Sequence, residues 1–335
     1  ASYRLLNTSK TRPLLNRALR GIYPPGSTIK PLMALAGLEY GEVNRYSGVF
    51  CPGFYRLPGS SHKFRDWRRG GHGSVSMDRA IAQSCDVYFY NLAFNLGIDR
   101  MHEFLDRFHL GRPTGVDLPG EKSALLPSQE WKRRVHKRSW FVGDTISAGI
   151  GQGYFLTTPL QLAHATAVIS QRGADFKPRV LLATEDPGTR IKTPEAPRPL
   201  PPVTLKNPQF WDTVIAGMLP VIRRCTARRI GGGPKYRIAG KTGTAQVFTV
   251  GQNERYNASR LARNLLDHAL FVAFAPADNP RIAVAVIAEH GGGGSKTAAP
   301  MARKVMDAYL LDKYDQPAAD EARNTQGDAR RDGSE

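Results

Sequence analysis

Long apolar runs, the many cysteines of a disulfide scaffold and internal repeats are all missing from this 335-residue sequence. No stretch of about 18 apolar residues occurs, so no segment is predicted to span a membrane, and no signal peptide opens the chain. The three cysteines, Cys51, Cys85 and Cys225, are too few for a disulfide scaffold. With 41% hydrophobic residues, the chain can still build the core of one large domain or two modest ones.

Acidic residues are also scarce, because 29 Asp and Glu oppose 47 Lys and Arg, for a net charge of +18. Such a balance favours an acidic partner, such as nucleic acid, anionic lipid or an anionic polymer. The basic residues are scattered, however, and no DNA- or RNA-binding motif is present. The densest basic run, residues 132–138, is predicted to be a solvated loop facing anionic lipid or cell wall. We therefore predict no nucleic-acid partner.

The order of the predicted elements indicates the fold class. Helices are expected at 27–40, at 76–96 with a break near 84–86, and at 99–108, 157–171, 207–222 and 300–311. A strand is expected at 236–247, and 269–275 with 282–289 reads as a hairpin. Irregular structure is expected at 41–75, 111–156, 184–206 and 249–266, and disorder at 313–335. This pattern predicts an α+β fold with an antiparallel sheet, flanking helices and a helical subdomain.

A loop that turns into a helix carries the first sign of chemistry. Pro24-Pro25-Gly26 disfavours a helix before Ser27, and an apolar helical face follows. Lys30 then lies about one turn from Ser27 on the same face. A serine hydroxyl becomes a nucleophile when a base removes its proton, and a desolvated lysine can be that base. Taken alone, Ser27 is better explained as a helix N-cap.

Two further segments change this interpretation. Ser84-Cys85-Asp86 falls between two helical halves, and Lys241-Thr242-Gly243-Thr244 lies inside a predicted strand. Singly, Ser84 could be a cap, Lys241 a solvated residue and Thr244 a β-former. Together and in this order, the segments match the S-x-x-K, S-x-N or S-x-D, and K-T-G set of penicillin-recognising serine enzymes.

On these motifs the sequence resembles the transpeptidase domain of class B penicillin-binding proteins over roughly residues 3–312. The resemblance includes the segments 23–31, 149–153 and 239–245. Asp86 in place of the commoner Asn, and Arg65-Asp66-Trp67 followed by Gly71-His72-Gly73, resemble the elongation-type penicillin-binding protein 2. The resemblance implies a β-lactamase-like transpeptidase fold, with one domain over 1–312, residues 1–26 as its lead-in, and a tail over 313–335.

The resemblance also implies a peptidoglycan D,D-transpeptidase that cross-links stem peptides during cell-wall elongation and is acylated by β-lactams. Ser27 would be the nucleophile and Lys30 its base, with Asp86 positioning Lys30. Ser84 would relay a proton to the leaving D-alanine, and the N–H groups of Ser27 and Thr244 would form the oxyanion hole. The substrate carboxylate would be held by charge and by hydroxyl donors, in a set comprising Lys241, Thr242, Gly243 and Thr244. Catalysis would need no cofactor.

The family has a membrane anchor and a pedestal domain before this domain, and neither is present in the sequence. Because the chain opens at Ala1 without an initiator Met, we interpret it as a fragment or processed form. The resemblance then implies a periplasmic domain of a protein anchored in the bacterial inner membrane. Its expected partner is a membrane glycosyltransferase of the elongation machinery.

Three alternatives share these motifs. A class A β-lactamase would need a deacylating Glu followed by Asn four residues later. None of Glu103, Glu121, Glu130, Glu185 and Glu195 has that Asn. A β-lactam sensor domain and a peptidoglycan-binding pseudoenzyme remain, and the intact catalytic residues make the pseudoenzyme the weaker of the two. The rate of penicillin turnover separates the β-lactamase from the transpeptidase.

A metal site is predicted from side chains between the first two motifs. Cys51, Asp66, His72 and Cys85 offer two thiolates, an imidazole and a carboxylate, which suit tetrahedral Zn²⁺. Residues 51–75 are poor in apolar side chains, so a structural metal could order them. The alternatives are a Cys51–Cys85 disulfide in an oxidising compartment, or a buried Cys85 beside a turn residue, His72. The close ligand spacing of strong zinc motifs is missing.

Overall fold

The late strands form a three-stranded antiparallel sheet, as their apolar patterns predict. The structure is a computed structural model that describes residues 2–9, 11–233, 235–247 and 261–311. The sheet contains β9 (Ala239–Ala245), β10 (His268–Ala275) and β11 (Ile282–Ala288), in the order β11-β10-β9. The hairpin of β10 and β11 confirms the prediction, and β9 is an edge strand within the described part of the chain.

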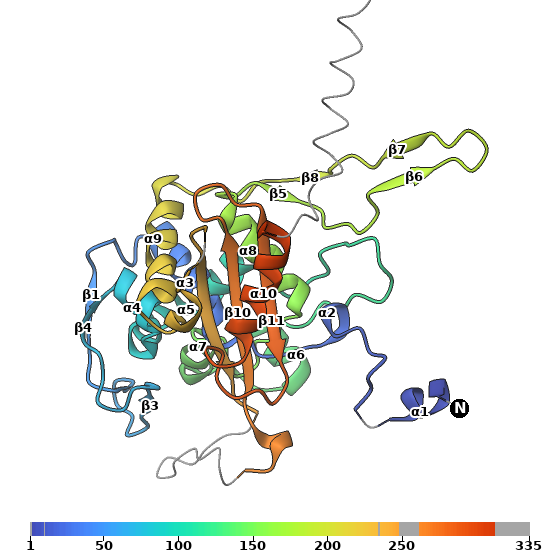
Figure 1. Ribbon diagram of the computed structural model, residues 1–335. Coiled ribbons are helices and arrows are strands. Elements are labelled where there is room, and N and C mark those ends of the chain that lie inside the picture. The colour runs from blue at the N-terminus through green and yellow to red at the C-terminus, as the bar shows by residue number, and fades with distance from the viewer. Residues whose placement is uncertain (1, 10, 234, 248–260, 312–335) are drawn as a thin grey trace, which may run out of the picture.

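Side chains alternate along β10, so the sheet is covered on both faces. One face packs on α10 (Ala298–Leu311), which lies in front of β10 and β11 in Figure 1, and contributes Ala269, Phe271 and Ala273. The other face joins the main helical core through Leu270, Val272 and Phe274. The result is a layered α+β architecture, which confirms the predicted fold class.

The main core is built from helices that precede the sheet in the chain. They are α3 (Lys30–Glu39), α4 (Met77–Gln83), α5 (Asp86–Asp106), α8 (Pro159–Ser170) and α9 (Gln209–Arg223). Every residue of α3 is buried. α8 begins as expected, because the Thr158 hydroxyl accepts from the N–H of Gln161 and the Gln161 side chain accepts from the N–H of Thr158.

Several local predictions were wrong. The first helix does not begin as an α-helix at Ser27: η1 (Gly26–Ile29) is a 3₁₀ turn, and α3 follows it. By contrast, the separate helix expected at 99–108 is present, because non-helical backbone at Gly97 divides α5 and a second helical segment follows it to Asp106. Residues 111–156 contain α6 (Gln129–His136) and α7 (Val142–Ala148), where loops were expected.

The basic run at 132–138 shows why the loop prediction for residues 111–156 was wrong. Lys132 lies in α6, buried, with its ammonium paired to Asp144 of α7, and is therefore not a solvated loop residue. The contact between Lys132 and Asp144 favours the buried helix over a solvated loop. The basic composition of residues 132–138 does not indicate that contact. Residues 41–75 are also more regular than expected. They hold the antiparallel pairs β1 (Gly48–Cys51) with β4 (Gly73–Ser76), and β2 (Phe54–Tyr55) with β3 (Phe64–Arg65).

The segment expected to be irregular at 184–206 forms an exposed excursion that contains most of a hairpin. β6 (Ala183–Glu185) and β7 (Lys192–Pro194) project from the body in Figure 1, next to the pair β5 (Asp175–Phe176) and β8 (Pro199–Leu200). The lead-in holds two short helices, α1 (Ser2–Thr8) and α2 (Arg17–Arg20). Two 3₁₀ turns, η2 (Arg228–Ile230) and η4 (Arg263–Leu265), lie before and after β9 in the chain.

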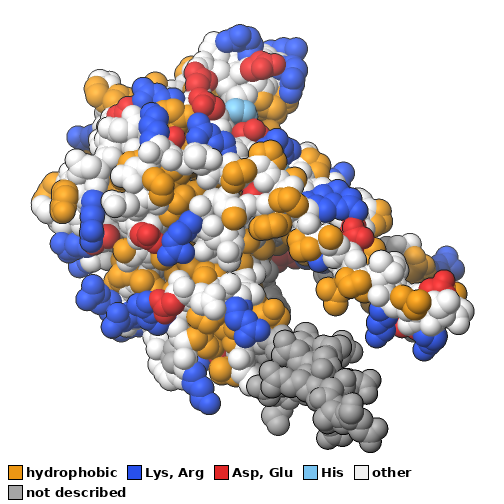
Figure 2. Space-filling view, turned by 90° about the horizontal axis from the view of Figure 1, so that it is seen from above, with side chains coloured by type: hydrophobic (Ala, Val, Ile, Leu, Met, Phe, Trp, Pro, Cys, Tyr) orange, Lys and Arg blue, Asp and Glu red, His pale blue; other side chains and the backbone are white. Residues whose placement is uncertain are grey.

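Basic side chains are spread over the surface seen from above, without a single large patch (Figure 2). Most of the expected 249–266 loop and the 313–335 tail lie outside the described residues. Within the described residues, no helix has both the length and the apolar character that crossing a membrane requires.

Candidate active site

The first motif sits where the 3₁₀ turn η1 packs against the edge strand β9. Gly26 has a φ of 53°, and its N–H donates to the Gly151 carbonyl at 2.9 Å. A Cβ at Gly26 would lie 2.5 Å from the carbonyl oxygen of Thr244, so only glycine permits this approach. Ser27 follows directly and is partly exposed. The glycine thus sets the distance between the predicted nucleophile and the third motif.

Lys30 is fully buried at the first turn of α3, three residues after Ser27. Its Nζ donates to Asp86 Oδ1 at 2.6 Å, to the Ser84 carbonyl at 2.9 Å and to Ser84 Oγ at 3.3 Å. The ammonium also lies 5.3 Å from the centre of the Phe89 ring. A buried ammonium needs such partners, because burial without them disfavours the charged form. The predicted contact of Asp86 with Lys30 is therefore present.

Ser84 connects the two lysines. It ends α4 in the left-handed region, with φ 58° and ψ 40°, a conformation that strains a residue with a side chain. Lys241 Nζ donates to Ser84 Oγ at 2.8 Å, and the same oxygen lies 3.3 Å from Lys30 Nζ. The hydroxyl therefore bridges the first and third motifs, which is the position that a proton relay requires.

The pKa of Lys241 is shifted by its surroundings. It is fully buried in β9, and burial followed by the nearby positive charge of Lys30 places its pKa well below the usual lysine range, with Asp86 acting in the opposite direction. A lowered lysine pKa at a cleft is typical of functional sites. Lys241 Nζ also donates to the Thr242 carbonyl at 2.9 Å.

Two residues near β9 were not singled out from the sequence. The Thr226 hydroxyl lies 3.0 Å from the Thr242 hydroxyl, and Gln152 Nε2 donates to the Thr244 carbonyl at 3.1 Å. Gln152 belongs to the 149–153 segment, which is part of the family resemblance but indicated no role for its side chain. Thr226 carries no local signal, because only the fold brings it to the strand.

Trp67 is a third residue that the sequence did not mark as functional. Its backbone N–H donates to Asp86 Oδ2 at 3.0 Å, and its indole Nε1 donates to the Ser84 carbonyl at 3.0 Å. That carbonyl also accepts from Lys30. Trp67 is 60% exposed although its donors are engaged. Trp67 thereby links the segment that contains Asp66 to the second motif, and much of its ring is exposed to solvent.

The four predicted metal ligands do converge. Cys51, Asp66, His72 and Cys85 are all buried, and their ligand atoms lie within 4.8 Å of one another. Asp66 Oδ2 is 3.5 Å from Cys51 Sγ and 3.4 Å from Cys85 Sγ, and His72 Nδ1 is 3.6 Å from Cys51 Sγ. Neither cysteine forms a disulfide. Zn²⁺ with bonds of ~2.0–2.3 Å separates tetrahedral ligands by roughly 3.3–3.8 Å, so the spacing fits.

The protonation chemistry of this cluster also suits a cation. Burial raises the pKa of the Cys85 thiol and lowers the pKa of His72. The neutral imidazole is the form that binds metal, and a bound ion would deprotonate the thiols. Asp66 also accepts from the N–H of Asp86 at 2.8 Å and of Val87 at 3.2 Å, at the start of α5. The cluster is therefore attached to the second motif by backbone as well as by sequence.

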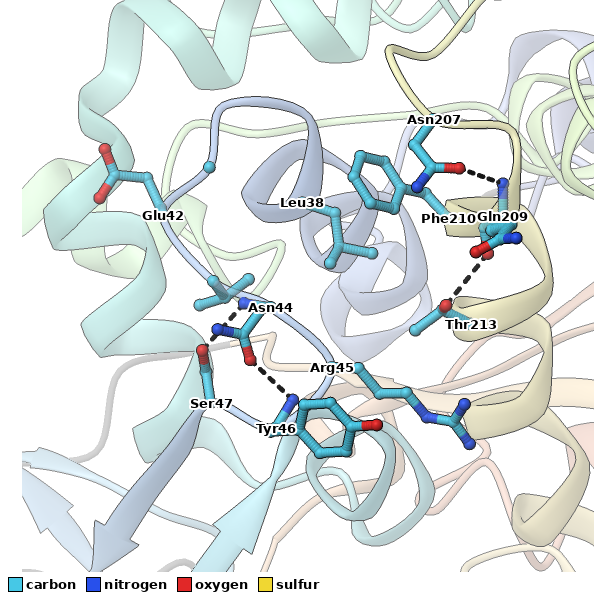
Figure 3. Close-up of a pocket in the computed structure, with 12 residues that line it drawn as sticks. Leu38, Glu42, Asn44, Arg45, Tyr46, Ser47, Asn207, Gln209, Phe210 and Thr213 are labelled. Carbon is cyan, nitrogen blue, oxygen red and sulfur yellow. Dashed lines mark hydrogen bonds between the residues drawn. The ribbon is translucent and has the colours of Figure 1, made fainter.

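A hollow of about 520 Å³ lies elsewhere, between the loop after α3 and the start of α9 (Figure 3). Its lining includes Leu38, Asn44, Tyr46, Asn207 and Phe210. None of the catalytic candidates lines it, so this hollow is separate from the three motifs. We assign the site from the convergence of the three motifs.

Comparison with known proteins identifies the family of the chain. Residues 2–307 match the model of the penicillin-binding protein transpeptidase domain. The chain is 48% identical over 318 residues to the peptidoglycan D,D-transpeptidase MrdA of Acinetobacter baumannii, covering 94% of this chain and 46% of that protein. It thus spans about half the length of the curated relatives it matches.

Solved structures give the same result. Pseudomonas aeruginosa PBP2 in complex with WCK 5153 is similar with 46% identity and a TM-score of 0.81, covering 93% of this chain and 67% of that one. A chain of a peptidoglycan synthase complex that coordinates polymerization and crosslinking has 33% identity and a TM-score of 0.77, covering 92% and 49%. The predicted resemblance to penicillin-binding protein 2 is confirmed. The chain belongs to the penicillin-binding protein transpeptidase domain family.

Proposed function

We propose that this chain is the catalytic domain of an elongation-type peptidoglycan D,D-transpeptidase. The observation that carries the proposal is the bridge from Lys30 through Ser84 Oγ to Lys241, with Ser27 three residues before Lys30 in the chain. One transpeptidase domain over residues 1–312, with 1–26 as its lead-in, accounts for the extent of the family match.

In this mechanism Ser27 Oγ attacks the carbonyl carbon between two terminal D-alanines, and Lys30 in its neutral amine form accepts the hydroxyl proton and becomes the ammonium. The new Oγ–C bond forms, and the C–N bond then breaks as Ser84 protonates the leaving amine. The lysines on either side of Ser84 return its proton. The N–H groups of Ser27 and Thr244 stabilise the oxyanion, at about 3–4 kcal/mol per donor. An amine from a neighbouring strand then takes the acyl group and regenerates Ser27.

The edge strand supports an extended peptide as substrate. β9 pairs with β10 on one side, and no strand among the described residues pairs with its other side. An edge of this kind can hydrogen-bond to an incoming extended chain. Thr244 is exposed on β9, whereas Lys241 and Thr242 of the same strand are buried. We assign to them, with Gly243, the binding of the substrate carboxylate.

A labelled penicillin tests the activity. We expect one covalent adduct per chain on Ser27, stable for many minutes, and none in Ser27→Ala. Ser123→Ala, which changes an exposed serine far along the chain, is the matched control and should label like wild type. Turnover of several penicillins per second would instead identify a β-lactamase. An adduct without transfer of a stem peptide to an acceptor amine would favour a sensor domain.

We further propose that Cys51, Asp66, His72 and Cys85 hold a structural Zn²⁺ with no place in the acyl transfer. Their spacing and burial support it, as does the contact of Asp66 with the start of α5. A bound ion would fix the position of Cys85. It would thereby also fix the two neighbours of Cys85 in the second motif, the strained Ser84 and Asp86, which contacts Lys30.

Metal analysis of chelator-free protein decides this point. About one zinc per chain is expected, with loss of zinc and slower penicillin acylation in His72→Ala. Cys225→Ser removes the third cysteine, which lies outside the cluster, and should keep both properties. Protein without metal, with a Cys51–Cys85 disulfide and normal acylation, would refute the proposal.

The cellular setting is proposed by analogy with the relatives. We propose a periplasmic domain anchored in the bacterial inner membrane by a segment outside this sequence, working with a membrane glycosyltransferase on peptidoglycan stem peptides. The similar chain in a peptidoglycan synthase complex supports this partner. Depletion in a rod-shaped host should give round cells, whereas filaments would indicate a division enzyme. No nucleic-acid partner is proposed.

A further inference from the structure

A second group of metal-binding side chains lies outside both sites described above. His109 follows the end of α5, His164 lies in α8, and Asp175 opens β5. His109 Nε2 is 2.9 Å from Asp175 Oδ2, and His164 Nε2 is 2.6 Å from Asp175 Oδ1. The two imidazoles stack at 4.9 Å with an angle of 21° between their planes. Two rings thus present the same nitrogen to one carboxylate.

The group is held inside the protein. The side chains of Asp175 and His164 are 0% and 4% exposed, and that of His109 is 16% exposed. His109 also adopts a φ of 59°, in the left-handed region that a side chain rarely adopts outside tight turns. The acyl-transfer mechanism uses none of these residues. Their burial and backbone strain therefore need another explanation.

We propose that His109, His164 and Asp175 form a second metal site, for one divalent transition-metal ion of the zinc or cobalt type. The three ligand atoms lie within 4.8 Å of one another. An ion with bonds of ~2.0–2.1 Å places tetrahedral ligands roughly 3.3 Å apart. From the present 2.9 Å and 2.6 Å, the nitrogen of His109 would have to move away from the carboxylate by about 0.4 Å and that of His164 by about 0.7 Å. Imidazole and carboxylate together favour such ions over calcium or magnesium.

Ion binding would rearrange the protons of the site. To bind an ion through Nε2, His164 must carry its proton on Nδ1, which gives up the hydrogen bond from Nε2 to Asp175 Oδ1. The bonds from the ion to Nε2 and to the carboxylate would replace that hydrogen bond, and Nδ1 is buried without a hydrogen-bond partner that would compete for the proton. Burial and the neighbouring His164 lower the pKa of His109, which favours its neutral, ligating form at neutral pH. Arg112 acts in the same direction and Asp175 in the opposite one.

Three protein ligands leave a fourth position, and the partial exposure of His109 lets water fill it. The ion would join the end of α5, the middle of α8 and the first residue of β5. β5 pairs with β8, and the exposed β6–β7 hairpin lies between these strands in the chain. Occupancy would therefore stabilise the base of that excursion, and the melting temperature would rise with metal concentration.

Cobalt titration of the full chain tests the proposal, because the two sites give different spectra. Co²⁺ at Cys51 and Cys85 produces thiolate-to-metal charge-transfer absorption, whereas a His and Asp site does not. After chelation and removal of free metal, we expect one cobalt per chain that is not associated with thiolate absorption. His109→Asn should weaken that cobalt more than about tenfold, since Asn tolerates the left-handed backbone while removing the imidazole.

His290→Asn is the matched control, since His290 has a φ of 55° and lies outside the group. It should bind the second cobalt like wild type. A wild-type chain that takes up no cobalt beyond the thiolate-bound ion overturns the proposal, whatever the variants do. Equal binding of the second cobalt by wild type and His109→Asn also overturns it. Circular dichroism of each variant shows that a loss of binding does not come from unfolding.

Discussion

Gly26→Ala offers the sharpest test of the active-site geometry. The new Cβ would lie 2.5 Å from the Thr244 carbonyl oxygen, so the two backbones must separate by about 0.9 Å to reach an ordinary contact of 3.4 Å. The proposed oxyanion donors are the N–H groups of Ser27 and Thr244, one on each side of this contact. A misplacement of about 1 Å costs on the order of 10²-fold in rate. The left-handed φ adds roughly 1–2 kcal/mol of strain.

Gly41→Ala separates the two effects. Gly41 has a φ of 74° and no atom within 4 Å of its Cβ position, so it carries the strain without the clash. Both variants should melt a few degrees below wild type. Only Gly26→Ala should slow acylation, by about 10²-fold, measured as the second-order rate constant with a fluorescent penicillin. Acylation of Gly26→Ala within about threefold of Gly41→Ala would refute the assigned geometry.

Three further predictions concern the lysine–serine network. Burial and Lys30 lower the pKa of Lys241 in the folded state, so between this lowered pKa and about pH 10 the unfolded chain binds more protons than the folded chain. The destabilisation of the fold by this lysine therefore grows as the pH falls toward its lowered pKa. Lys241→Met should therefore lose acylation but have a larger free energy of unfolding than wild type, with the largest difference at low pH. Urea unfolding that shows the same difference at every pH would contradict this. Ser84→Gly should relieve the strain at φ 58° and be more stable than Ser84→Ala by about 1 kcal/mol, while both acylate slowly; equal melting contradicts it. Trp67→Phe removes the indole donor to the Ser84 carbonyl and should cost about 1 kcal/mol by urea unfolding, with metal content unchanged. A stability equal to that of wild type would show that this donor contributes nothing.

Local sequence determined the elements whose signals are local. Thr158 and Pro159 start α8 because a cap and a first-turn proline act within one turn of the helix. The apolar runs of β10 and β11 predict a hairpin because a short turn joins two segments of strand-forming residues. The motif residues Ser27, Ser84 and Lys241 could be named for the same reason, since their order and local context are read along the chain.

Tertiary structure decided which side chains meet. Lys132 looks like a solvated charge until Asp144 and its burial are seen, and Thr226 has no signal until the fold brings it to β9. The bridge of Ser84 between two lysines depends on contacts 54 and 157 residues apart in the chain. His109, His164 and Asp175 follow no ligand spacing, because each lies on a different element. Hydrogen bonds and ion pairs act over about 3 Å in space, so sequence predicts them only where neighbours in space are also neighbours in the chain.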